Sequence, residues 1–306
     1  MSESRKPKIA LALGSGSARG WAHIGVIRAL EKIGIKPNIV CGTSVGALIG
    51  CMYATGQLQA LEDWILKLDK KEIIKYLDIN LLTGGGFVEG QSLINFFRQE
   101  MGDHRIEDLD IQFACVATDL EQGLEKWIQS GSILDAVRAS MALPGLFTPV
   151  RHGKHWLVDG GLVNPVPISV CRALGADKVI AVNLNGDILG KHLQKGKQIE
   201  KSFFDSLTER SLISHFAKQV KGNFQQWFDV KDQAPGLFEV IASSINIMQD
   251  RITRSRMAGD PAEVLLAPRL AHIGLMEFDR AREAIAAGEL AVEQVIPHIK
   301  NMLDLT

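Results

Sequence analysis

Short apolar runs and stretches of helical spacing alternate through the first half of the chain. Ile9–Leu13 is an apolar run that ends at glycines, as a buried parallel strand does. Residues 21–33 carry apolar side chains at helical spacing and are followed by Gly34, a residue type that commonly ends helices. Residues 39–41 predict a second buried strand, and Val45–Ala54 a second helix. This β-α-β-α order predicts a mostly parallel sheet with helices on its faces.

The same alternation continues to about residue 183. Further strands are predicted at 111–117, 125–129, 155–158 and 178–183. Further helices are predicted at 60–77, 91–101, 133–142 and 168–174. A glycine-rich stretch at 81–90 is interpreted as a linker loop, with a lid hinge as the alternative.

The pattern changes after Asn185. Residues 186–201 are polar and rich in lysine, which predicts an exposed connection. From about 201 to 306 the spacing is helical, without a clear strand, and prolines divide it into pieces. The sequence therefore predicts an α/β domain at 8–185 and a helical C-terminal extension at 186–306.

Charge and cysteine content narrow the possible classes. The 34 Lys and Arg against 35 Asp and Glu give a net charge of −1, without the basic footprint that nucleic-acid binding requires. Nor does this balance supply an electrostatic attachment to an anionic membrane. The four cysteines lie singly in apolar runs, and no Cys/His cluster has the spacing of a metal site. Buried reduced thiols, no metal and a cytoplasmic location are predicted.

One segment requires a membrane test. Residues 38–61 carry no charge and are long enough to span a bilayer, but glycines and polar residues interrupt them. A buried strand, a tight turn and a buried helix are the favoured interpretation, with a transmembrane helix as the alternative. The apolar run Ile9–Leu13 is too brief for the core of a signal peptide.

The first candidate for chemistry is the turn at 14–20, Gly-Ser-Gly-Ser-Ala-Arg-Gly, directly after the first strand. Backbone N–H groups in a glycine-rich turn that opens a helix stabilise negative charge. A dinucleotide fingerprint is excluded, because Arg19 stands where the third glycine belongs and no acidic residue ends the second strand. An anion cradle or an oxyanion hole remains, with a purely structural turn as the alternative.

The second candidate is Ser44, in Gly42-Thr-Ser-Val-Gly46. A strand precedes this motif and a helix follows it, as a nucleophile elbow requires. The small flanking residues allow a sharp turn that raises the serine hydroxyl into open space. The alternative is an ordinary helix N-cap serine.

A nucleophilic serine needs a base, and the third motif offers one. The four histidines that come late enough in the chain, His192, His215, His272 and His298, do not stand at an obvious strand-end loop, and His152 and His155 are expected in a small hairpin. Asp159, in contrast, ends an apolar strand and is followed by Gly160 and Gly161. Because an ordinary aspartate is a poor base at pH 7, partial burial is expected to raise its pKa. A common Asp-Gly-Gly turn is the alternative.

Together these motifs resemble the patatin-like phospholipase family, in particular its small bacterial members related to the esterase domain of neuropathy target esterase. The segment 138–149, which contains Pro144, is similar to the proline-containing stretch that precedes the family's catalytic aspartate. The resemblance implies a three-layer α/β/α sandwich with a mostly parallel central sheet. It also implies a Ser44–Asp159 dyad without histidine, metal or cofactor, and an oxyanion hole of backbone amides around Ser15, Gly16 and Ser17. The supporting motif residues are Gly14, Arg19, Gly20, Gly42, Gly46, Gly160, Gly161 and Pro144.

The chain departs from the family at Ser15 and Ser17, where glycine is usual. An oxyanion hole uses backbone N–H groups, so serine can replace glycine at both positions. A required positive φ would place the serine under strain. The expected activity is hydrolysis of carboxylic esters of lipids, with a lipid ester as the partner and transient membrane-surface contact left open. An acyltransferase and a low-activity regulatory protein are the alternatives. The sequence indicates no oligomeric state.

Overall fold

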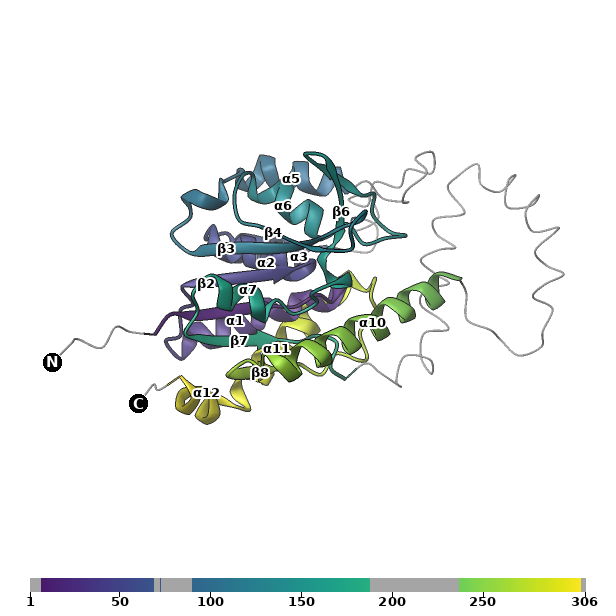
Figure 1. The fold of residues 1–306 in the computed structure, drawn as a ribbon. Coiled ribbons are helices and arrows are strands. Elements are labelled where there is room, and N and C mark those ends of the chain that lie inside the picture. Colours follow the sequence, from purple (N-terminus) through teal and green to yellow (C-terminus); the bar gives the residue numbers. More distant parts are fainter. Residues whose placement is uncertain (1–6, 69–71, 73–89, 188–236, 304–306) are drawn as a thin grey trace, which may run out of the picture. The chain divides into compact units, whose positions relative to one another are not determined.

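The computed structural model describes residues 7–68, 72, 90–187 and 237–303 (Figure 1). Within them, eight strands form one sheet with the path β5-β6-β3-β2-β1-β7-β8, and β4 pairs with β3 off this path. Neighbouring pairs among β3, β2, β1, β7 and β8 are parallel, whereas β4, β5 and β6 join by antiparallel pairing. The strands are β1 (Ile9–Leu13), β2 (Ile39–Thr43), β3 (Gln112–Asp119), β4 (Glu125–Ile128), β5 (Val150–His152), β6 (His155–Asp159), β7 (Lys178–Val182) and β8 (Val264–Leu266).

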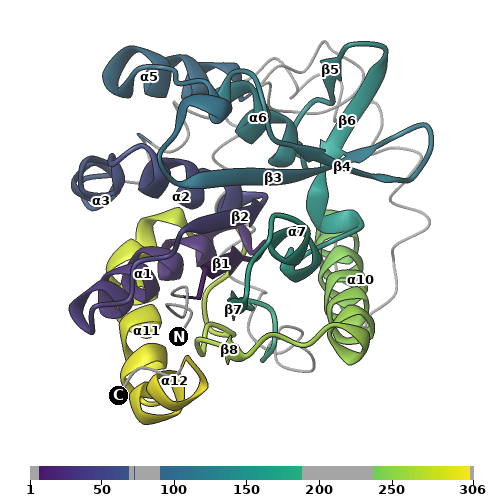
Figure 2. The same cartoon turned by 60° about the vertical axis from the view of Figure 1, so that its left-hand side comes forward.

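Helices cover both faces of the sheet. Every residue of β1 and β2 is buried, as expected for strands packed on two sides. Figure 2 shows α1, α2 and α11 on one side of the parallel strands and α7 on the other. The helices are α1 (Ala22–Lys32), α2 (Val45–Ala54), α3 (Leu58–Ile65), α5 (Gln91–Met101), α6 (Ile133–Ser140), α7 (Ile168–Ala173), α10 (Leu237–Gly259), α11 (Ala281–Glu293) and α12 (Ile296–Met302). The predicted three-layer α/β/α sandwich with a mostly parallel sheet is confirmed.

The chain divides into two compact units, residues 1–187 with 248–306 and residues 188–247. Of the smaller unit, the structure describes the first part of α10. The larger unit contains the whole sheet, and one apolar core lies on each of its faces. The C-terminal segment from Met248 thus belongs to the α/β unit.

The register of β3 brings two distant segments together. Residues Gln112 to Val116 of β3 pair in parallel with β2, and Val116 lies opposite Thr43, the last residue of β2. The next residue of β3, Ala117, lies opposite Asp159, the last residue of β6. Ser44, directly after β2, and Asp159 therefore come to the same edge of the sheet.

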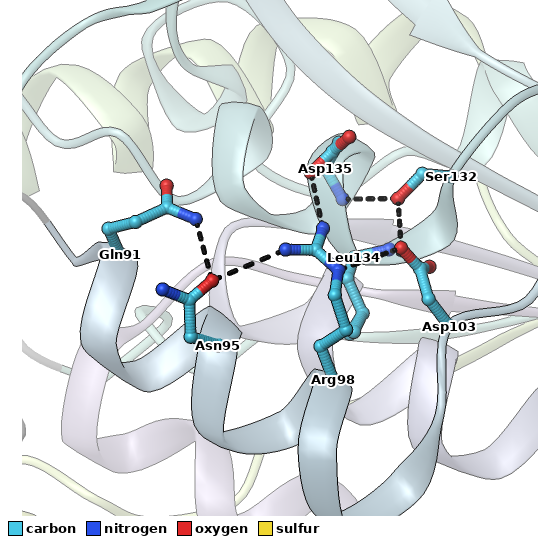
Figure 3. Close-up of polar contacts among 7 residues, drawn as sticks. All are labelled: Gln91, Asn95, Arg98, Asp103, Ser132, Leu134 and Asp135. Carbon is cyan, nitrogen blue, oxygen red and sulfur yellow. Dashed lines mark hydrogen bonds and ion pairs between the residues drawn. The ribbon is translucent and has the colours of Figure 1, made fainter.

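A polar cluster at one end of α6 fixes this helix against α5 (Figure 3). Arg98 of α5 donates to Asp135 of α6 at 2.7 Å and to Asp103 at 3.1 Å. The Ser132 hydroxyl caps α6 by accepting from the Asp135 N–H at 3.1 Å, and it donates to Asp103 at 2.7 Å. The opposite end of α6, at Ser140, reaches the serine turn described below.

Most predicted elements are confirmed, with two corrections. The helix expected at 60–77 is α3, which ends at Ile65, and residues 69–71 and 73–77 lie outside the described residues, as do 81–89 of the expected loop. The expectation of no strand after residue 201 is wrong, because Val264–Leu266 forms β8 and pairs in parallel with β7. This strand has only three residues, too few for a periodic signal.

The glycine-interrupted stretch at 38–61 forms the end of the loop before β2, then β2, the turn at Ser44, α2 and the start of α3. Among the residues that the structure describes, no helix combines the length and apolarity needed to cross a bilayer. All four cysteines are buried and unpaired, as predicted.

Candidate active site

Ser44 occupies a strained turn between β2 and α2. Its backbone has φ 58° and ψ −126°, a region that residues with a Cβ atom rarely occupy. The turn is possible because Gly42 and Gly46 leave room for the backbone. A Cβ at Gly46 would lie 2.2 Å from the carbonyl oxygen of Leu13, and one at Gly42 would lie 2.4 Å from that of Gly46. The structure therefore forms the predicted strand-turn-helix elbow.

The hydroxyl of Ser44 points to Asp159. Its Oγ donates to Oδ2 of Asp159 at 2.6 Å, across 115 residues of sequence. The other carboxylate oxygen, Oδ1, accepts from the Gly161 N–H at 2.7 Å. The carboxylate is buried, whereas Ser44 is half-buried. One oxygen is thus held by the backbone while the other faces the serine.

Burial changes the acid strength of Asp159. Loss of hydration raises the pKa of this carboxyl from 3.8 to about 6, although the hydrogen bonds from Ser44 and Gly161 act in the opposite direction. The expectation of a raised pKa agrees with this value. At pH 7 the group is mostly ionised, and it binds a proton more readily than an exposed aspartate does.

The end of α6 holds both members of this pair. The Ser44 N–H donates to Oγ of Ser140 at 2.9 Å, and that hydroxyl donates to the carbonyl of Val116 at 2.6 Å. The Asp159 N–H donates to the carbonyl of Ala142 at 2.9 Å. The motif 138–149 contains Ser140 and Ala142, but the sequence singled out only Pro144, which lies two residues after Ala142 in the turn that follows.

The glycine-rich turn lies at the same edge, after β1. The Ser15 N–H donates to the carbonyl of Pro165 at 2.9 Å, so this amide is engaged and the expectation that it serves an oxyanion hole is corrected. Within the described residues, no hydrogen bond uses the N–H groups of Gly16 and Ser17 as donors. These two amides remain available to a ligand.

The two serines that replace glycine in this turn behave differently. Ser17 has φ 52°, so the strain anticipated for a serine falls on this residue. Its hydroxyl donates to the carbonyl of Leu275 at 2.6 Å. Ser15 does not have a positive φ, and its hydroxyl donates to Oε1 of Gln249 at 3.1 Å.

A buried polar chain supports the turn from behind. Oε1 of Gln249, on α10, also accepts from Nδ2 of Asn185 at 3.0 Å. Asn185 in turn accepts at Oδ1 from Nη1 of Arg19, again at 3.0 Å. Arg19, Asn185, Gln249 and Ser15 are all buried. The sequence placed Arg19 in the motif but missed Gln249 and Asn185, because each is an isolated polar residue far from the motif along the chain.

Gln249 also contacts the aspartate motif. A Cβ at Gly161 would lie 2.4 Å from Nε2 of Gln249, so a larger residue there would displace this amide. Gly160 is required for a different reason, since its Cβ would lie 2.1 Å from the carbonyl oxygen of Val116. One side chain of α10 thus lies against both the glycine-rich turn and the Asp159 turn.

Two further charged or titratable groups surround the turn. Burial lowers the pKa of Arg19 to about 10, opposed by the charge of Asp187, so the guanidinium stays charged at neutral pH. His23 is buried, and its Nε2 lies 2.8 Å from the carbonyl of Gly14. Burial lowers the pKa of His23 to about 4, so the imidazole is neutral and donates this hydrogen bond.

No histidine replaces Asp159 as the partner of Ser44 in the part of the chain that the structure describes. His155, on β6, is the histidine nearest to Asp159 in the sequence, but its Nδ1 lies 2.7 Å from Oδ2 of Asp119. No group of three His, Cys, Asp or Glu side chains among the described residues is arranged to hold a metal ion. The site is therefore built from one serine, one carboxylate and backbone amides.

Fold and site define a class: a three-layer α/β/α protein that presents a serine on a strained strand-to-helix turn beside a buried aspartate. The family model described as patatin-like phospholipase matches residues 11–172, which include both residues. The chain belongs to the patatin-like phospholipase family, as the resemblance predicted. It is accordingly a hydrolase of lipid esters.

Relatives extend the similarity to the rest of the chain. An uncharacterised NTE family protein of Mycobacterium tuberculosis is 32% identical over 96% of this chain and 92% of its own length. The lysophospholipase nte1 of Aspergillus fumigatus is 34% identical over 96% of this chain but only 18% of its own. Human patatin-like phospholipase domain-containing protein 6 is 36% identical over 58% of this chain and 13% of its own. The chain thus spans a small part of these two larger relatives.

Proposed function

We propose that Ser44 and Asp159 form a catalytic dyad that hydrolyses acyl esters of phospholipids or lysophospholipids. The observation that carries this proposal is the 2.6 Å hydrogen bond from the Ser44 hydroxyl to a buried carboxylate whose pKa is raised to about 6. A nucleophilic serine requires a neighbouring base with a proton affinity suited to neutral pH. No other base in the described part of the chain contacts the Ser44 hydroxyl.

In the first half of the reaction, Asp159 Oδ2 accepts the hydroxyl proton while Ser44 Oγ attacks the ester carbonyl carbon. The negative charge then develops on the former carbonyl oxygen. The free N–H groups of Gly16 and Ser17 are the donors proposed for it, each worth about 2.7–4 kcal/mol in comparable sites. Collapse of this intermediate breaks the ester bond, and Asp159 returns the proton to the departing alcohol. An acyl-serine remains.

In the second half, water replaces the alcohol. Asp159 accepts a proton from water while the water oxygen attacks the acyl-serine carbonyl. The N–H groups of Gly16 and Ser17 stabilise the second oxyanion. Collapse regenerates the Ser44 hydroxyl with the proton from Asp159 and releases the fatty acid. The N-terminus of α2, which begins directly after Ser44, adds a favourable dipole at the reacting centre.

The substrate class rests on the family and on the names of relatives. The fungal relative is named a lysophospholipase and the human one a phospholipase domain-containing protein, and each is much longer than this chain. An acyl group on a glycerophospholipid or lysophospholipid is the corresponding substrate here. The four buried, unpaired cysteines support a reducing, cytoplasmic compartment for the reaction.

A regulatory protein of low activity is the second candidate. The observation in its favour is the positive φ of Ser17, at a position where the family usually has glycine. An acyltransferase would use the same acyl-serine and pass it to an alcohol instead of water.

A panel of phospholipid, lysophospholipid and short-chain esters, assayed with the wild-type chain and Ser44→Ala, tests the proposal. We expect turnover that disappears in Ser44→Ala and releases free fatty acid. Acyl transfer to an added alcohol would favour the acyltransferase, and turnover that survives Ser44→Ala would overturn the dyad. Absence of turnover with every ester would favour the regulatory protein.

A further inference from the structure

Two hairpins extend past the edge of the sheet where Ser44 and Asp159 meet. β3 pairs with the end of β2 at Val116 and continues for three more residues to Asp119 before it turns into β4. At about 3.3 Å per residue, the β3–β4 turn lies about 10 Å beyond the end of β2. The β5–β6 hairpin pairs with this same extension of β3. Both hairpins therefore stand beside the candidate active site.

Large apolar side chains are exposed on these hairpins. We call them the hairpin patch: Leu120, Leu124, Trp127 and Trp156, which are 53%, 57%, 39% and 43% exposed. The Leu120 N–H donates to the carbonyl of Trp156 at 2.8 Å, so the two hairpins meet directly. Single exposed apolar residues are common, but four on two adjoining hairpins are typical of an interaction surface.

The strand register places the two tryptophans of the hairpin patch on one face. Trp127 lies directly opposite Val116, and Val158, two residues after Trp156 on β6, lies opposite Thr118, two residues after Val116 on β3. Extending the β3–β6 register by one residue places Trp156 opposite Leu120. Residues directly opposite each other in antiparallel strands, and residues an even number apart in one strand, share a face. Trp127 and Trp156 therefore face the same way, and Leu120 adjoins Trp156 through its backbone hydrogen bond.

Exposed basic side chains accompany the apolar ones on the β5–β6 hairpin. On the β3–β4 hairpin, Asp119 and Glu125 are paired with His155 and Arg256, and Glu121 is exposed. The β5–β6 hairpin, residues 150–159, contains two basic and two histidine side chains, and its one acidic residue, Asp159, is buried. Arg151 and Lys154 are exposed, and the Arg151 guanidinium lies 5.9 Å from the centre of the Trp156 ring. Exposed tryptophan and leucine beside arginine and lysine is the composition that binds the interface of an anionic bilayer.

We propose that the hairpin patch docks this protein on the surface of a bilayer that contains anionic lipids. The inference rests on the proposed function in that a lipid is the substrate to be reached. Asp159 follows Trp156 by only three residues on the same strand. A bilayer that accepts Trp156 and Leu120 therefore brings lipid ester groups to the edge that carries Ser44. The rim of Arg151 and Lys154 faces the anionic head groups.

Binding is tested on the inactive full chain, Ser44→Ala, so that catalysis does not affect the result. Sucrose-loaded vesicles of phosphatidylcholine with about a third phosphatidylglycerol are sedimented with the protein, and vesicles of phosphatidylcholine alone serve for comparison. We expect stronger binding to the anionic vesicles, weakened by salt and by Arg151→Gln. Leu120→Ser or Trp156→Ser should reduce binding by about tenfold, as expected for losing one inserted apolar side chain.

The matched control is Leu290→Ser, which removes a leucine of similar exposure from α11, outside the hairpin patch. Vesicle binding by this variant should equal that of the parent. Equal losses in all three serine variants, or no vesicle binding at all, would overturn the proposal. Thermal melting shows whether Trp156→Ser is folded. If it is not, the vesicle binding of Leu120→Ser, on the exposed turn, tests the proposal.

A second readout separates this inference from the proposed function. With Ser44 present, Leu120→Ser should keep full turnover of a water-soluble short-chain ester and lose most of its activity on vesicle lipids. Equal turnover of vesicle lipids by Leu120→Ser and the wild type would contradict docking while leaving the dyad intact. Ester turnover that is independent of Ser44, with vesicle binding still lost in Leu120→Ser, would contradict the dyad alone.

Discussion

Two turns at the edge that carries the candidate active site each contain a serine with positive φ, but they fix different groups of that serine. Among the described residues, Ser44 and Ser17 are the only non-glycine residues with positive φ, 58° and 52°. At Ser44 the N–H is held by Ser140, and the hydroxyl is directed at Asp159. At Ser17 the hydroxyl donates to the carbonyl of Leu275, and the N–H has no hydrogen-bond acceptor within the described part of the chain.

The difference shows that hydrogen bonds from neighbouring segments determine which group of a serine with positive φ stays open to a ligand. One turn presents a side chain and the other presents backbone amides. Each of the two serines has one polar group fixed by a neighbour, and the other group is the one that the proposed mechanism uses. Replacing each serine by glycine therefore separates side-chain chemistry from backbone chemistry.

The largest effect is expected for Ser44→Gly. Glycine accepts the positive φ without strain, so the fold should persist, but the hydroxyl is lost. Ester turnover should fall by about 10⁴-fold or more, as when nucleophiles of other hydrolases are removed. Turnover within tenfold of the wild type, in a variant with normal circular dichroism, would contradict the role of Ser44.

A large effect is also expected for Gly46→Ala, because the new methyl group would lie 2.2 Å from the carbonyl oxygen of Leu13. The elbow has to open, at a cost of about 1–3 kcal/mol or more in the free energy of unfolding. Chemical denaturation measures this. Gly259→Ala is the matched control, since no atom lies within 4 Å of a Cβ there. A Gly46→Ala chain as stable and active as the control would contradict the tight elbow.

An intermediate effect is expected for Gln249→Leu. The change removes the acceptor shared by the Ser15 hydroxyl and Asn185 and leaves their donors buried without it. The glycine-rich turn should become less ordered, lowering kcat about tenfold with little change in KM. Ser15→Ala, which removes only one of the two donors, should have a smaller effect. Stopped assays over a substrate series measure both constants, and a change in KM alone would argue against a positioning role.

The smallest effect is expected for Ser17→Gly. The backbone N–H is kept and the strain of the positive φ is relieved, while the hydrogen bond to Leu275 is lost. The equilibrium constant for unfolding and kcat should both stay within about twofold of the wild-type values, because relief of the strain and loss of the hydrogen bond oppose each other. A large rise in kcat would show that serine at this position limits the enzyme, as the low-activity alternative requires.

The sequence predicted the features that depend on local chemistry. The elbow at Ser44 and the helix Val45–Ala54 follow from a strand, two glycines and a helical run within a few residues. The partner of Ser44 required the family resemblance, because no periodicity connects residues 115 positions apart. Gln249 was missed for the same reason, since its contact with Ser15 spans 234 residues.

The remaining failures also come from contacts outside the local sequence. The three residues of β8 form a strand because β7 offers a free edge beside them, and propensity alone does not indicate this. The Ser15 amide was expected to bind an oxyanion, but its N–H donates to the carbonyl of Pro165, which is 150 residues later in the chain. Such tertiary partners decide which donors of a motif remain available.

The central claim is that Asp159 activates Ser44, and fluorophosphonate labelling as a function of pH tests it most directly. The reagent should label Ser44, identified by peptide mass spectrometry, at a rate that is high above pH 6. Since Asp159 acts as a base only when ionised, the rate should fall as the pH drops through its pKa of about 6. In Asp159→Asn the labelling should be at least about a hundredfold slower and lose this pH dependence. Labelling at another residue, or an unchanged rate and pH profile in Asp159→Asn, would contradict the account.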